Sequence, residues 1–305
     1  MKETPIIPPY LTPGDRVAVV SPSGVVDPLA VKSAVKVIES WGLQVTVGAS
    51  CLAVEGPFAG TDAQRILDLQ QALDDKSVKA ILCSRGGYGM SRIIDRVDFS
   101  AFVASPKWIV GYSDITVLNM WVGTLFGVAS IHGEMLLNYN NPDNTERSIT
   151  TVRDLLFGKP AIYSWNGVAV HRKTATGILT GGNLAMLYSL AGTLAMPETD
   201  GKILFIEDIG EYYYAVDRML QSFRLGGILN NLSALLVGDF GDMQDQRIPF
   251  GKSIKEIVTD VAGGFGYPIY FGFPSGHSND NPAIFLGREA IITADGTNLR
   301  LEYQG

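Results

Sequence analysis

Apolar runs and helical segments alternate along the first 130 residues, and this alternation constrains the fold more than any other feature of the sequence. Each run is short enough for a buried strand, and each intervening segment places apolar side chains at helical spacing. The predicted strands lie within 15–24, 43–48, 78–84 and 108–113, and the predicted helices at 28–41, 61–75, 89–96 and 116–127. Alternation of this kind predicts an α/β domain with a mostly parallel sheet and helices on both faces.

The chain changes character near residue 140, where a polar stretch with a proline, 138–148, interrupts the pattern. Helical candidates beyond it are confined to 182–192 and 214–225, and the remaining apolar runs read as strands. These runs are KILFIED, LSALLVGDF, PIYFGFP, EAIITADG and NLRLEYQ. We therefore predict three parts: an α/β domain at 1–140, a linker at 141–165, and a smaller β-rich, barrel-like domain at 166–305.

The composition is that of a globular protein and argues against several classes. Hydrophobic residues make up 46% of the 305 residues and charged residues 18%, with a net charge of −7. No Lys/Arg cluster marks a nucleic-acid-binding surface. No run of about 20 apolar residues could cross a membrane, and the first residues do not resemble a signal peptide. The sequence predicts a soluble, cytoplasmic protein without nucleic-acid or membrane partners.

Metal-binding and disulfide patterns are missing from the sequence. Cys51 and Cys83 are too few for a disulfide framework. There is no HExxH motif and no Cys/His cluster at ligand spacing. We predict that the protein has no catalytic metal.

Ser113 follows the predicted strand of "KWIVGYSDIT" and precedes a helix. Ligands of open parallel sheets bind at the carboxyl ends of strands, where this serine would lie. A nucleophile at that position would have the amide of Asp114 beside it to stabilise an oxyanion. The stretch lacks the G-x-S-x-G pattern of the α/β-hydrolases. Helix capping by Ser113 or Asp114 is the competing interpretation.

The glycine-rich stretch "SRGGYGM", 84–90, also follows a strand, so we expect it at the same sheet edge as Ser113. It is neither a Walker A loop nor a dinucleotide-binding loop, because the required spacing is missing. An amide of Gly86 or Gly87 would suit an oxyanion hole, although an ordinary tight turn is equally compatible. Arg85 would pair with a substrate carboxylate or remain a solvated surface residue.

A serine nucleophile needs a base, and the chain has three histidines: His132, His171 and His277. The polar loop "PSGHSNDNP" favours His277, because a histidine there stays partly solvated. The strand "ILFIED" ends in Glu207 and Asp208, either of which could orient the histidine. Their spacing does not decide between them, and a helix cap or ion pair remains an alternative role.

Six stretches in this order resemble one family, the serine LD-carboxypeptidases, which comprise the muramoyl-tetrapeptide carboxypeptidases and the related microcin-immunity peptidases. The resemblance extends from about residue 10 to residue 302. The stretches are GDRVAVVSPSG, ILCSRGGYG, IVGYSDIT, TGGNLAML, LFIEDIGEYYYAVDRML and GHSNDNPAIFLG.

The resemblance implies an N-terminal α/β domain and a β-rich C-terminal domain that together form a Ser-Glu-His triad across a cleft. By motif match the nucleophile would be Ser113, the acid Glu207 and the base His277. The backbone amides of Asp114 and Gly87 would form the oxyanion hole. The resemblance further implies a homodimer that needs no metal or cofactor.

The implied activity is a serine peptidase that releases C-terminal D-alanine from murein tetrapeptides through an acyl-enzyme, in cell-wall recycling. The candidates for substrate binding are Arg85, Gly86, Tyr88, Asn183 and Glu211.

One position departs from the family pattern. Family members often have His-Gly-Pro after the nucleophile helix, whereas this chain has Glu134 after His132 and Gly133. We expect Glu134 to reshape one wall of the cleft.

Two other functions remain open. One is a microcin-immunity-type peptidase that cleaves a peptidyl- or aminoacyl-nucleotide conjugate, with Trp165 or Tyr212 as an aromatic platform for the base. The other is a non-catalytic protein that binds a small molecule.

Overall fold

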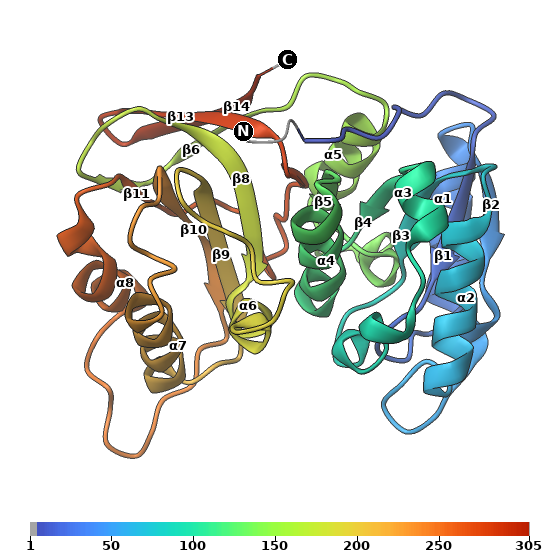
Figure 1. Ribbon diagram of the computed structural model, residues 1–305, viewed down its shortest axis with the longest axis horizontal. Coiled ribbons are helices and arrows are strands. Elements are labelled where there is room, and N and C mark those ends of the chain that lie inside the picture. The colour runs from blue at the N-terminus through green and yellow to red at the C-terminus, as the bar shows by residue number, and fades with distance from the viewer. Residues whose placement is uncertain (1–4, 305) are drawn as a thin grey trace. The chain divides into compact units, whose positions relative to one another are not determined.

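The computed structural model describes residues 5–304 and divides into two compact units. The first comprises the chain up to Pro160 together with Asn279–Phe285, and the second comprises Ala161–Ser278 and the chain from Leu286 onward. Both units combine helices with a sheet (Figure 1). The chain therefore passes from the first unit to the second, returns to the first for seven residues, and ends in the second.

The first unit is built on a six-stranded sheet with the order β12-β5-β4-β3-β1-β2. Strand β1 pairs in parallel with β2 and β3, and β4 pairs in parallel with β3 and β5, as the alternating sequence pattern predicts. The strands are β1 (Arg16–Val20), β2 (Gln44–Val47), β3 (Val78–Cys83), β4 (Trp108–Val110), β5 (Ser130–His132) and β12 (Ile284–Leu286). The helices are α1 (Pro28–Ser40), α2 (Asp62–Asp74), α3 (Ser100–Ala104), α4 (Thr116–Phe126) and α5 (Glu146–Leu156).

Local capping explains where the predicted helices of this unit begin and end. The Asp27 side chain accepts a hydrogen bond from the Leu29 amide at the start of α1. Thr61 and Gln64 form a reciprocal capping box at the start of α2. Helix α4 ends at Gly127, whose φ of 66° is left-handed and suits a glycine.

Two segments of this unit differ from the sequence expectations. Residues 89–96, expected as one short helix, form two 3-10 turns, Met90–Arg92 and Ile94–Arg96. The segment 141–165, expected as a linker, contains α5, whose buried side chains share one face. Its β-branched run at 149–152 lowers helix propensity, and packing of the apolar face compensates for this.

The second unit contains an eight-stranded mixed sheet with the order β6-β14-β13-β8-β9-β10-β11-β7. Its strands are β6 (Ile162–Asn166), β7 (Val168–Val170), β8 (Ala175–Asn183), β9 (Ile203–Ile209), β10 (Ala234–Gly241), β11 (Ile269–Phe271), β13 (Glu289–Asp295) and β14 (Asn298–Tyr303). The central strands β8, β9, β10 and β11 are parallel to one another. The two edge strands, β6 and β7, are separated by Gly167 alone, so the sheet curves until its edges meet along one segment.

Three helices accompany this curved sheet: α6 (Leu184–Leu190), α7 (Tyr213–Leu225) and α8 (Ile254–Ala262). Helix α6 packs against β8 and β9, and α7 packs between α6 and α8 (Figure 1). Helix α8 was not expected from the sequence, although its Ser253–Glu256 capping box is a recognisable start signal. The Phe273 ring packs edge-on against Trp165 and Phe205 in the core of this unit.

Candidate active site

Ser113 lies at a sharp turn between β4 and α4, and its backbone is left-handed with φ of 60°. Within residues 5–304, the other non-glycine residues with positive φ are His171 and Asp242. A side chain in this region strains the backbone by about 1–3 kcal/mol, and such strain clusters at functional sites. The turn therefore has the conformation of a nucleophile elbow, although its sequence lacks the flanking glycine pattern.

The competing capping role for this serine has no support in the geometry. A 3-10 turn, Ser113–Ile115, precedes α4, and neither element receives a side-chain hydrogen bond at its N-cap. The amide of Asp114 lies in this first turn, where N–H groups lack intrahelical partners. Ser113 is half-buried and Asp114 is buried. The turn thus leaves the hydroxyl and the neighbouring amide uncommitted to helix capping.

The glycine loop, residues 84–90, lies directly beside this turn. A Cβ placed on Gly86 would lie 3.0 Å from Cβ and 3.1 Å from Oγ of Ser113, so only glycine fits there without displacing the serine. The next residue, Gly87, has φ of 95° and is exposed. The Gly24 amide donates to the Gly86 carbonyl over 2.9 Å, which fixes the loop against the segment after β1.

Two other residues of the glycine loop are candidates for substrate binding. Arg85 is half-buried, and its Nη1 donates to the Val25 carbonyl over 2.6 Å. Part of its guanidinium is therefore committed to holding the loop. Tyr88 is 54% exposed, and its ring packs against Phe58 at 6.0 Å between centroids. The Tyr88 ring is available at the surface of the loop.

In the second unit, Nδ1 of His277 lies 2.7 Å from Oε2 of Glu207. Glu207 is wholly buried near the end of β9, whereas 13% of the His277 side chain is exposed. A carboxylate at this distance favours the tautomer with the proton on Nδ1, in which the lone pair lies on Nε2. Glu207 thus fixes the orientation of the His277 imidazole.

Asp208, the other acid at this strand end, faces away from the histidine because side chains alternate along a strand. Its carboxylate accepts hydrogen bonds from Asn183 Nδ2 and from the amides of Ala185 and Ile209, each over 2.9 Å. Burial and the neighbouring Glu207 charge raise the pKa of Asp208 to about 7. Asn183 also caps α6, so its side chain holds Asp208 and the helix start together.

The other two histidines lie in different surroundings. His132 is fully buried in β5, with its ring centroid 5.8 Å from that of Tyr112. His171 is exposed, and its Nε2 lies 2.9 Å from the Gly263 carbonyl. His171 thus contacts a backbone carbonyl, whereas a buried carboxylate orients His277.

Asp239 is a second carboxylate near His277 that the sequence analysis did not identify. It lies in β10, beside β9, and its amide donates to the Ser275 carbonyl. Burial raises the pKa of Asp239, and the nearby His277 opposes that shift. The signal was available, because "LLVGDF" ends a strand with an acid as "ILFIED" does. The candidate Glu211 is half-buried before α7, and its carbonyl accepts from the Gln244 amide over 2.8 Å.

Glu134 is only 1% exposed, so its carboxylate is part of the interior of the first unit. It accepts hydrogen bonds from Asn138 Nδ2 at 2.8 Å, from the Met135 amide at 3.1 Å and from Asn281 Nδ2 at 3.3 Å. Burial raises the pKa of Glu134. The bond from Asn281 helps to hold the segment 279–285 in the first unit. The sequence expectation of a reshaped cleft wall did not include this role.

Each unit thus brings together its own part of the predicted site. Ser113, Asp114 and the glycine loop meet in the first unit, and Glu207 and His277 meet in the second. Among residues 5–304, no group of three or more His, Cys, Asp or Glu side chains is placed to hold a metal ion. No helix in that range has both the length and the apolar character needed to cross a membrane.

Comparison with known proteins gives consistent matches over most of the chain. Residues 17–133 match the N-terminal domain of the LD-carboxypeptidases, and residues 176–292 match their C-terminal domain. The probable murein peptide carboxypeptidase of Bacillus subtilis is 34% identical over 95% of this chain and 92% of its own length. The murein tetrapeptide carboxypeptidase of Pseudomonas aeruginosa is 30% identical over 93% of this chain and 94% of its own.

A solved structure has the same fold. The crystal structure of muramoyltetrapeptide carboxypeptidase from Oxalobacter formigenes superposes with a TM-score of 0.87 and 28% identity, covering 95% of this chain and 99% of that one. Fold, site and matches together define a carboxypeptidase, a hydrolase of peptides. The chain belongs to the LD-carboxypeptidase family.

A second group of relatives bears on the alternative function. The microcin C7 self-immunity protein MccF of Escherichia coli is 24% identical over 81% of this chain and 80% of its own length. The two groups share the fold, and this chain is more similar in sequence to the murein carboxypeptidases above.

Proposed function

We propose that this carboxypeptidase releases C-terminal D-alanine from murein tetrapeptides through a Ser113–His277–Glu207 triad, in cell-wall recycling. The left-handed φ of 60° at Ser113 carries the proposal, because a strained, uncapped serine at a strand-to-helix turn is the conformation that presents a nucleophile. The names of the murein carboxypeptidase relatives support the substrate class.

The first half of the proposed reaction forms an acyl-enzyme. Ser113 Oγ attacks the carbonyl that precedes the terminal D-alanine while His277 Nε2 accepts its proton. The amides of Asp114 and Gly87 donate to the resulting oxyanion, which is worth about 3 kcal/mol per donor. Glu207 stabilises the charged imidazole. Collapse of the intermediate breaks the amide bond, and His277 returns the proton to the departing amine.

The second half hydrolyses the ester. His277 removes a proton from water, the resulting hydroxide attacks the acyl carbonyl, and Ser113 Oγ leaves with the proton from His277. The shortened peptide is released and the serine is restored. Because the nucleophile and the base belong to different units, this reaction needs both units to align during turnover.

Substrate binding in this proposal uses groups on both units. The remaining guanidinium nitrogens of Arg85 and the exposed backbone at Gly87, which follows the buried Gly86, suit the terminal carboxylate of the peptide. Tyr88 offers an exposed aromatic surface. In the second unit, Glu211 would contribute to substrate binding from its position before α7. Asn183 would contribute through its hydrogen bond to Asp208.

The test is D-alanine release from a purified murein tetrapeptide by the wild-type protein and by Ser113→Ala. Wild-type release and its loss in a folded Ser113→Ala protein are expected. Near-native turnover by the variant would refute the nucleophile assignment. A cytoplasmic homodimer is part of the same proposal. Light scattering on the purified protein measures its oligomeric state, and cell fractionation measures its location.

The similarity to MccF favours one competing function, cleavage of a peptidyl- or aminoacyl-nucleotide conjugate. The aromatic platform expected for that substrate does not include Trp165, which is buried and donates to the Phe271 carbonyl. Tyr212 is 43% exposed and remains available. Assaying one preparation with both substrates separates the two functions, and we expect faster turnover of the murein tetrapeptide.

A further inference from the structure

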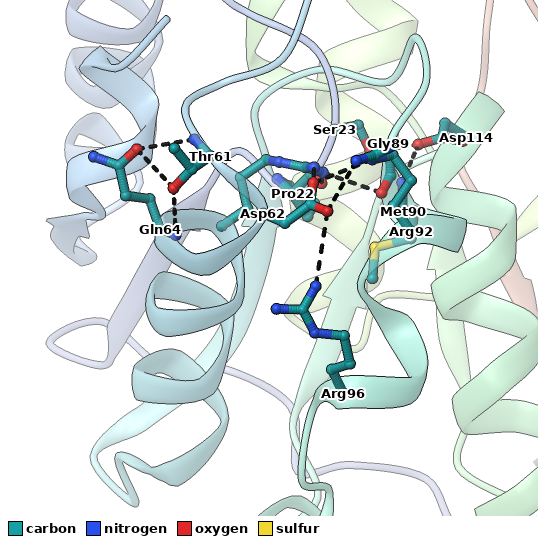
Figure 2. A network of polar contacts seen from close by, with 11 residues as sticks. Pro22, Ser23, Thr61, Asp62, Gln64, Gly89, Met90, Arg92, Arg96 and Asp114 are labelled. Carbon is teal, nitrogen blue, oxygen red and sulfur yellow. Dashed lines mark hydrogen bonds and ion pairs between the residues drawn. The ribbon is translucent and has the colours of Figure 1, made fainter. Parts of the chain in front are cut away.

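The side chain of Asp114, as distinct from its backbone amide, joins the nucleophile turn to two other loops. Its Oδ2 accepts a hydrogen bond from Ser23 Oγ over 2.5 Å and another from the Met90 amide over 2.8 Å (Figure 2). Ser23 lies in the segment after β1, and Met90 ends the glycine loop. Asp114 is 1% exposed and Ser23 is wholly buried. One carboxylate therefore connects the loops that follow the neighbouring strands β1, β3 and β4, at the carboxyl ends of these strands.

Arg65 connects two of the same loops from α2. Its side chain is wholly buried, and Nη1 donates to the Pro22 carbonyl over 2.6 Å and to the Gly89 carbonyl over 3.0 Å. Asp62 pairs with Arg65 and also with Arg92, the second pair at 3.0 Å. Figure 2 shows Asp62 together with Pro22 and Gly89 in this network. The glycine loop is thus bound at Gly89 by the Arg65 guanidinium and at Met90 by the Asp114 carboxylate.

This double attachment fixes the distance between the Gly87 amide and the Ser113 turn, which the proposed oxyanion hole requires. Gly86 packs directly on Ser113, and its carbonyl accepts from the Gly24 amide. The hydroxyls of Ser21 and Ser84 also hydrogen bond to each other at the start of both loops. Any movement of the glycine loop would move the Gly87 amide away from an oxyanion formed at Ser113.

The energetics favour a positioning role over a stabilising one. Burial raises the pKa of the Asp114 carboxyl and lowers that of the Arg65 guanidinium, so burying each charge opposes folding. Within residues 5–304, Oδ1 of Asp114 has no hydrogen-bond partner, and an unsatisfied buried acceptor costs about 1–3 kcal/mol. Apolar side chains of similar size would fill the space at lower cost, but they could not hold backbone groups of the loops in place.

We propose that the Asp114 carboxylate and the Arg65 guanidinium are positioning groups that fix the glycine loop, and with it the Gly87 amide, against the Ser113 turn. The inference rests on the proposed serine mechanism and adds to it two groups that do not touch the substrate. Removing either group leaves both oxyanion amides chemically present but misplaced. A misplacement of about 1 Å costs about 100-fold in rate.

The variants are Asp114→Ala, Asp114→Asn, Ser23→Ala and Arg65→Met. In Asp114→Ala and Arg65→Met, we expect kcat for the tetrapeptide to fall about 100-fold while KM changes far less. In Asp114→Asn the amide oxygen can accept both hydrogen bonds, so kcat should recover to within about tenfold of wild type. Ser23→Ala removes one of the two hydrogen bonds to Asp114, and we expect kcat to fall about fivefold.

Lys107→Met is the matched control for lost stability. Lys107 is a buried cation directly before β4, at the amino end of the strand that leads to Ser113, and it binds the carbonyls of Ala72, Leu73 and Asp75. Its replacement should lower the melting temperature and leave kcat near that of wild type. Unchanged kcat in both Asp114→Ala and Ser23→Ala, or failure of Asp114→Asn to recover activity, would overturn the positioning role.

A second measurement separates this inference from the proposed substrate. The rate at which a fluorophosphonate labels Ser113 depends on oxyanion stabilisation and needs no peptide. We expect labelling by Asp114→Ala to slow in proportion to the fall in kcat, and labelling by Lys107→Met to stay normal. Normal labelling of the wild-type protein without D-alanine release would contradict the proposed substrate alone. Equal labelling of wild type and Asp114→Ala would contradict the positioning role alone.

Discussion

His277 Nδ1 lies 2.7 Å from Glu207 Oε2, and the Glu207 side chain is completely shielded from solvent. The adjacent acid, Asp208, points the other way and holds the start of α6. Alternation along β9 therefore gives two neighbouring carboxylates two separate tasks. One orients a histidine, and the other secures the helix that follows β8.

Replacing Glu207 tests the first of these tasks. Glu207→Gln keeps the shape but offers no negative charge to a charged imidazole, so kcat should fall about 10⁴-fold. Glu207→Ala should retain more activity than Ser113→Ala, because an unoriented histidine still accepts protons whereas a missing hydroxyl cannot attack. Steady-state D-alanine release measures both. Asp208→Asn is the control at the neighbouring position. If its kcat falls as far as that of Glu207→Gln, the assignment of the orienting role to Glu207 is wrong.

The strain at Ser113 predicts a trade between stability and activity. Ser113→Gly should raise the free energy of unfolding by about 1 kcal/mol, because glycine adopts φ of 60° without a Cβ penalty. Ser113→Ala keeps the Cβ and should leave stability unchanged. Both variants should be inactive. Urea unfolding compares the three proteins, and equal stability of the glycine and alanine variants would show that the turn is unstrained.

Gly86 predicts a steric effect confined to the active site. In Gly86→Ala the new methyl would lie 3.1 Å from Ser113 Oγ, so the serine or the loop must shift and kcat should fall at least about tenfold. Gly123→Ala in α4 is the control, since the new Cβ would lie 3.8 Å from its nearest neighbour, the Val128 carbonyl. That control should keep its activity and gain about 0.5–1 kcal/mol in helix stability. Steady-state kinetics measures kcat of both variants, and thermal melting measures their stability. Equal kcat in the two variants would contradict the steric effect.

Lys107 predicts a pH dependence of stability. Burial lowers its pKa from 10.5 to about 8, so the folded protein loses this proton at a lower pH than the unfolded chain does. Between those values the unfolded chain binds more protons, and stability therefore rises with pH, by at most about 1.4 kcal/mol per pH unit. Relative to Lys107→Met, the wild-type protein should gain stability from pH 8 to pH 10. Urea unfolding at both pH values measures that difference, and a constant difference would contradict the lowered pKa.

Local sequence signals were sufficient for much of the first unit. The capping box of Thr61 and Gln64 and the left-handed Gly127 act within one helical turn, so they can be read without knowing the fold. The same kind of signal at Ser253 and Glu256 marks α8 and was overlooked. Helix α5 is a different case, because its β-branched residues weaken the local preference and its helix depends on packing of one face.

The sequence by itself determined the alternating strands and helices, the placement of Ser113 after a strand and the candidacy of His277. These follow from hydrophobic period and turn composition, which are local properties. Only the tertiary structure decided the φ of Ser113, the partner of His277 and the burial of Glu134. Each of these depends on groups that are distant in the chain. The glycine packed on Ser113, the strand beside His277 and the Asn281 amide beside Glu134 are brought close only by folding.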